Sequence, residues 1–64
     1  MLLEELYDYY QKSWANVMRE TKVGSTSIQN WKKQGFIPIL SQLKIEKRTN
    51  GMFIAKLEHA RPQD

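Results

Sequence analysis

The chain has 64 residues, no cysteine and a formal net charge of +3 at neutral pH. This length suits one small domain near the lower limit for a single apolar core, and the lack of cysteine excludes disulfides and thiolate metal sites. We see no apolar run of about 20 residues that could span a membrane and no basic leader. We therefore expect a single domain over residues 1–64 that works in the cytoplasm without membrane contact.

Acidic and basic side chains are unevenly distributed along the chain. Residues 1–8 contain three acidic residues and no basic one, whereas residues 9–57 contain nine basic and two acidic residues. Such a basic middle with an acidic flank indicates that one face of the molecule is directed at a polyanion. An ordinary solvated charged surface is the alternative.

The first predicted element is an amphipathic helix over about residues 2–11. Leu3, Leu6, Tyr7 and Tyr10 recur at intervals of three and four residues, as on one face of a helix. The acidic residues lie in the first two turns, where the helix dipole stabilises negative charge. We expect Asp8 and Tyr9 to face outward.

Residues 13–35 predict a helix-turn-helix. Ser13 is a suitable N-cap for a helix over about 14–21, and Lys22, Val23 and Gly24 form the turn. A second helix over about 25–34 then ends at Gly35, which readily takes the left-handed conformation.

The helix of residues 25–34 has two distinct faces. At 100° per residue, Ile28 and Trp31 fall on one side and four hydrogen-bonding residues fall within an arc of roughly 100° on the other. Gln and Asn pair with adenine edges, Lys pairs with guanine or phosphate, and Thr can serve either. The four residues are therefore typical of a DNA-reading surface, although any surface helix turns polar residues outward: Thr26, Gln29, Asn30 and Lys33.

The C-terminal third supports two interpretations. In the first, residues 39–49 form a helix after Pro38, with Leu40, Leu43 and Lys47 as a stripe along it and a short extended segment after Gly51. In the second, strands pair around an Asn50-Gly51 hairpin, which gives an α+β fold of three helices and a hairpin. We favour the first, a mostly α domain of four helices.

The overall pattern resembles the Cro-type regulators of lambdoid phages and prophages. The resemblance rests on Tyr10, Ser13, Ala15, Val17, Val23, Ile28, Trp31, Gly35, Ile37-Pro38, Ile45-Glu46, Thr49 and Gly51. Members of that family are small repressors that bind operator DNA, and both all-helical and mixed forms of their C-terminal half are known. The spacing of residues 45–51 resembles the helical members.

The resemblance implies that the helix of residues 25–34 enters the major groove. Two groups of candidate contacts follow. The candidates for base reading are Ser25, Thr26, Ser27, Gln29, Asn30 and Lys33. The candidates for phosphate contact are Lys12, Ser13, Lys22 and Lys32.

Two positions differ from the usual helix-turn-helix pattern. Met18 occupies a position that is most often alanine, which implies either a wider approach of the two helices or a rotated pair. Lys22 occupies a position that is usually glycine. We therefore expect a positive φ at Lys22, at a cost of about 1 kcal/mol.

The leading hypothesis is a sequence-specific double-stranded DNA-binding transcriptional regulator, a Cro-like repressor. One alternative is a winged-helix DNA binder of excisionase or MerR-like type, with the Asn50-Gly51 hairpin as its wing. Another is a protein-binding module such as an antitoxin or anti-repressor. We expect no enzyme activity, metal, cofactor or small-molecule substrate, because the one histidine, His59, lies in a polar tail without partners for chemistry.

We also expect a weak homodimer that forms on a palindromic operator. A single recognition helix reads only a few base pairs, so two copies are needed for specific affinity. The segment after Gly51 has more apolar residues than a small core needs and could pair edge to edge with its copy: Met52, Phe53, Ile54 and Leu57.

Overall fold

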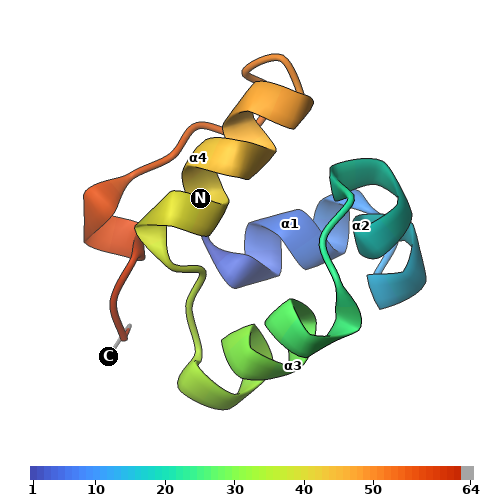
Figure 1. Ribbon diagram of the computed structural model, residues 1–64, viewed down its shortest axis with the longest axis horizontal. Coiled ribbons are helices and arrows are strands. Elements are labelled where there is room, and N and C mark those ends of the chain that lie inside the picture. The colour runs from blue at the N-terminus through green and yellow to red at the C-terminus, as the bar shows by residue number, and fades with distance from the viewer. Residues whose placement is uncertain (63–64) are drawn as a thin grey trace.

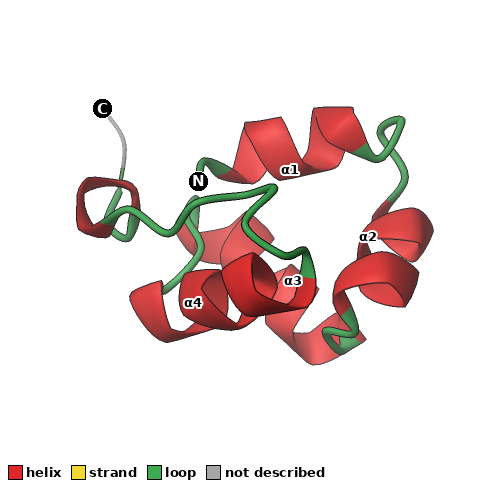
Figure 2. Ribbon diagram, turned by 90° about the horizontal axis from the view of Figure 1, so that it is seen from above, coloured by secondary structure: helices red, strands yellow, loops and turns green. Residues whose placement is uncertain are grey.

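The computed structural model describes residues 1–62, and four α-helices and one short 3-10 helix account for their regular secondary structure (Figure 1). The elements are α1 (Leu3–Tyr9), α2 (Trp14–Thr21), α3 (Ser25–Gln34), α4 (Ile39–Arg48) and η1 (Leu57–His59). Loops connect them, and residues 1–62 contain no strand (Figure 2). The predicted mostly α fold with four helices is confirmed.

The alternative fold with a C-terminal hairpin is wrong. Asn50 and Gly51 do adopt the positive φ values of a tight turn, 54° and 82°. They end a helix instead of joining two strands, since the Gly51 amide donates to the Glu46 carbonyl at 2.9 Å. The same local signal fits a helix terminus and a hairpin, and good helix formers before it decide between them. Residues 1–62 therefore also lack the wing of the winged-helix alternative.

Helix α1 is shorter than the predicted range of 2–11. It ends at Tyr9, and both Gln11 and Lys12 take positive φ values of 61° and 55°. The Lys12 amide donates to the Tyr7 carbonyl at 2.9 Å, which closes the helix and turns the chain toward Ser13. Two consecutive left-handed residues of this kind leave no signal in the hydrophobic periodicity.

The bounds of α2 and α3 agree with the prediction. The Ser13 hydroxyl caps α2 by accepting a hydrogen bond from the Asn16 amide at 3.3 Å. Gly24 is the N-cap of α3, and Gly35, with φ 85°, ends it by donating its amide to the Trp31 carbonyl at 2.7 Å. Local capping chemistry thus accounts for both helices.

The turn between α2 and α3 contains the expected left-handed residue. Lys22 has φ 58° and ψ 34°, so the prediction of a positive φ at this position is confirmed. Met18 is half-buried and packs against the core.

One apolar core lies between the helices. Its members come from every α-helix, from the residue at the start of the chain and from two loops. They are Met1, Leu6, Val17, Ile28, Trp31, Ile37, Ile45 and Phe53. Trp31 is only 2% exposed and is the largest fully enclosed side chain in the described chain. The core therefore holds α3 by its inner face and leaves the opposite face free.

Helix α4 is rotated relative to the predicted stripe. Leu40 and Leu43 are 71% and 48% exposed, whereas Gln42 and Ile45 are fully buried. The predicted stripe of Leu40, Leu43 and Lys47 is therefore exposed, because the spacing of leucines alone does not fix which face of α4 is buried. Gln42 tolerates burial because its amide is hydrogen-bonded on both ends.

The C-terminal segment is also partly inside. Phe53, expected on a spare surface, is 8% exposed and its ring centroid lies 5.2 Å from that of Tyr9. Met52, Ile54 and Leu57 are exposed, as predicted. Phe53 therefore belongs to the apolar core.

His59 does not lie in a solvated tail. It is the last residue of the 3-10 helix η1, which was not predicted. It is half-buried, and its Nδ1 atom has no hydrogen-bond partner within residues 1–62.

None of the helices in residues 1–62 is both long and apolar enough to cross a lipid bilayer.

Candidate nucleic-acid interface

The outward face of α3 presents the predicted set of hydrogen-bonding side chains. Four of them are exposed at positions that recur along one side of the helix: Thr26, Gln29, Asn30 and Lys33. On the opposite side Ile28 and Trp31 are 3% and 2% exposed and fix the rotation of the helix. Core packing therefore fixes which face of α3 is exposed.

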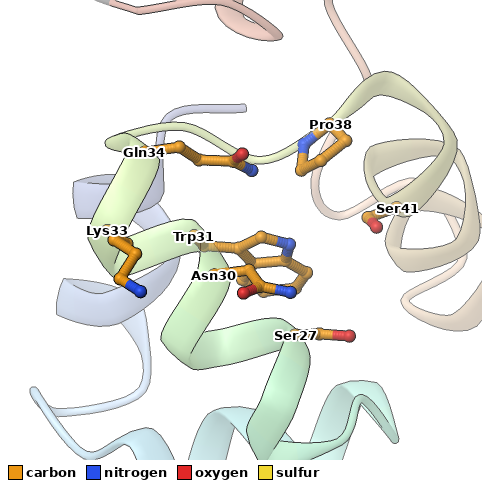
Figure 3. A pocket seen from close by; sticks show the side chains of 7 residues that line it. All are labelled: Ser27, Asn30, Trp31, Lys33, Gln34, Pro38 and Ser41. Carbon is orange, nitrogen blue, oxygen red and sulfur yellow. The ribbon is translucent and has the colours of Figure 1, made fainter.

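The remaining two base-reading candidates lie elsewhere on α3. Ser25 is exposed at the first position of the helix, and the N-cap before it is Gly24, which has no side chain to bond the free amides. Ser27 is half-buried and points toward α4 (Figure 3). The structure therefore separates Ser27 from the outward four.

A hollow of about 350 Å³ lies between α3 and the start of α4. Figure 3 shows the Trp31 indole directed into it from α3, with Pro38 and Ser41 on the other wall. All its lining residues are Ser27, Asn30, Trp31, Lys33, Gln34, Pro38 and Ser41.

The N-terminus of α2 gathers three phosphate candidates. Ser13 caps the helix, and Lys12 precedes it in the chain. The Lys32 Nζ atom lies 5.6 Å from the ring centroid of Trp14, the first residue of α2, which is a cation–π distance. Trp14 in turn packs against Tyr7, with ring centroids 4.6 Å apart. Lys32 thus sits on the α2 side of α3, while Lys33 faces outward.

The fourth phosphate candidate, Lys22, lies at the other end of α2 and has different neighbours. Arg48 Nη1 donates to the carbonyls of Thr21 and Lys22 at 2.8 and 3.1 Å, which ties the end of α4 to the turn. A second hollow of about 200 Å³ opens beside this turn. It is lined by Lys22, Val23, Gly24, Ser27, Ser41, Lys44 and Arg48.

Four residues that line these two hollows were not among the candidates predicted from the sequence: Gln34, Ser41, Lys44 and Arg48. The last three are spaced at i, i+3 and i+7, so they share one face of any helix over 39–48. The signal was present, but the sequence does not say which face of α4 turns toward α3.

The described residues contain no group of three or more histidine, cysteine, aspartate or glutamate side chains placed to hold a metal ion.

Comparisons of this chain with protein-family models, with curated proteins and with solved structures find no match. The resemblance to Cro-type regulators therefore stays a prediction from the residue pattern.

Proposed function

We propose that this protein is a sequence-specific double-stranded DNA-binding transcriptional regulator, a Cro-like repressor of phage or prophage type. It inserts α3 into the major groove of operator DNA in the bacterial cytoplasm. The observation that carries the proposal is the outward face of α3, where Thr26, Gln29, Asn30 and Lys33 are exposed on a helix held from behind by Trp31.

The chemistry of this face suits base edges. An amide side chain such as Gln29 or Asn30 can pair bidentately with adenine, and Lys33 can donate to guanine. Lysine at the flank neutralises phosphate and positions the helix without reading sequence. Lys32 and Lys12 lie near the N-terminus of α2 and have this phosphate-contacting role in the proposal.

The working unit in this proposal is a homodimer that forms on a palindromic site. Exposed apolar side chains remain on the C-terminal segment, with Ile54 and Leu57 at 53% and 74% exposure. Strand pairing is not the favoured contact, because the Ala55 and Lys56 amides already donate to the side chains of Glu46 and Gln42 at 2.7 and 2.9 Å. Side-chain packing is the favoured contact.

The function is tested by selecting bound duplexes from a random library and measuring affinity at several salt concentrations. For a DNA-binding protein, the logarithm of the association constant falls linearly with the logarithm of the salt concentration, because phosphate contacts release counterions. A wild-type protein that shows no salt-dependent duplex binding would refute the proposal and favour a protein partner.

The reading face is tested on the selected site. Gln29→Ala and Asn30→Ala should each cost about 1–3 kcal/mol there, relax preference at one base pair and leave non-specific affinity unchanged. Gln34→Ala is the matched comparison for base preference, because Gln34 is an exposed amide on the same helix but lies outside the outward four, and this variant should leave base preference unchanged. Equal losses on all sequences for Gln29→Ala and Asn30→Ala would show that these side chains do not read bases.

A further inference from the structure

The two hollows beside α3 are neighbours. Both are lined by Ser27 from α3 and by Ser41 from α4. The first hollow extends to Lys33 and Gln34, and the second extends to the turn that contains Lys22. We call the two neighbouring hollows together the α3–α4 groove.

The lining of the α3–α4 groove is suited to an anion. The chain has seven acidic residues, yet none of the described residues that line either hollow is acidic. Four lining residues are basic, and three of these, Lys22, Lys44 and Arg48, gather at one end. Hydroxyl groups of Ser27 and Ser41 add neutral donors in the middle.

The basic end is partly preorganised. The two carbonyl bonds made by Arg48 Nη1 hold the guanidinium beside the turn. A guanidinium has five N–H donors, so these bonds do not exhaust it. A cation already held in place loses less side-chain entropy when it meets a phosphate.

We propose that the α3–α4 groove binds the sugar–phosphate backbone of one DNA strand while the outward face of α3 reads bases. Lys44, Lys22 and Arg48 neutralise its phosphates, and Ser27 and Ser41 donate hydrogen bonds to them. Ser27 is thereby a backbone contact. The proposal rests on the proposed function, and it extends the DNA-binding surface to α4.

The test compares two lysines that carry the same charge at different places. Lys44 is exposed at the basic end of the groove, whereas Lys56 is exposed on the C-terminal segment and lines a separate hollow with Glu5 and His59. Lys44→Gln should reduce the magnitude of the salt slope by about 0.9 on duplex DNA, the value for one lost phosphate contact. Lys56→Gln, with the same change in net charge, should leave the slope at the wild-type value.

The results of these experiments distinguish a failure of the groove proposal from a failure of the proposed DNA-binding function. Equal slopes for Lys44→Gln and Lys56→Gln, with Gln29→Ala still losing preference at one base pair, would overturn the groove and leave DNA binding intact. A wild-type protein without salt-dependent binding would overturn both. Ser27→Ala is a second test of the groove. This variant should weaken binding to all sequences equally. A lost preference at one base pair would show instead that Ser27 contacts a base.

Discussion

Gln42 shows how one polar residue joins distant parts of this chain. Its Oε1 atom accepts hydrogen bonds from the nitrogen of Met1 at 2.8 Å and from the amide of Lys56 at 2.9 Å. Its Nε2 atom donates to the Ile37 carbonyl at 2.8 Å. Burial lowers the pKa of the Met1 amino group below its usual 8.0, although the charge on Glu5 opposes this. A single side chain thus connects α4 to the start of the chain, the loop before α4 and the C-terminal segment.

We predict that Gln42→Leu destabilises the protein by about 2–6 kcal/mol. Leucine fills a similar volume but leaves the Ile37 carbonyl and the Lys56 amide unpaired, at about 1–3 kcal/mol for each buried group. Urea denaturation followed by circular dichroism measures the change. Gln34→Leu is the control, since Gln34 is exposed and should change stability by less than about 0.5 kcal/mol. Similar losses for both variants would show that burial of the Gln42 amide is not the cause.

At the scale of elements, the turn of residues 22–24 sets how α2 and α3 meet. Lys22 holds a left-handed conformation that costs a side-chain-bearing residue about 1 kcal/mol. Its carbonyl and that of Thr21 accept from Arg48, so α4 stabilises the turn from outside. A favourable tertiary contact therefore offsets a local strain.

We predict that Lys22→Gly is more stable than Lys22→Ala by about 1 kcal/mol. Both variants lose the same charge, and only alanine keeps the Cβ atom that the left-handed region disfavours. Thermal or urea unfolding of the two variants gives the difference. If alanine were as stable as glycine, the turn would have to change conformation in solution.

At the scale of the whole molecule, the proposed dimer needs a surface on which two copies contact each other. Removing the segment from Phe53 onward is a poor test, because Phe53 belongs to the core and the truncated chain would lose an aromatic side chain that packs on Tyr9 and Tyr10. An exposed residue of the same segment is better. Leu57 is 74% exposed, so a charged substitution there leaves the core intact.

We predict that Leu57→Glu keeps the fold and the affinity for a half-site but loses cooperative binding to a full site. A charge in an apolar contact opposes dimer formation on the palindrome, where half-sites lie about 34 Å apart. Titration of half-site and full-site duplexes measures this. Leu40→Glu, at a position 71% exposed on α4, is the control with the same charge. If both variants bind the full site as cooperatively as the wild type, the dimer does not use this segment.

The sequence by itself determined α2, α3 and the outward face of α3. Ser13, Gly24 and Gly35 act on the backbone next to them, and the spacing of Ile28 and Trp31 fixes which face is buried, so these features depend on neighbours within a few residues. Only the tertiary structure decided that Gln42 and Phe53 are buried and that a groove opens between α3 and α4. Gln42 is satisfied by Met1, 41 positions away in the chain, and no local pattern records such a partner.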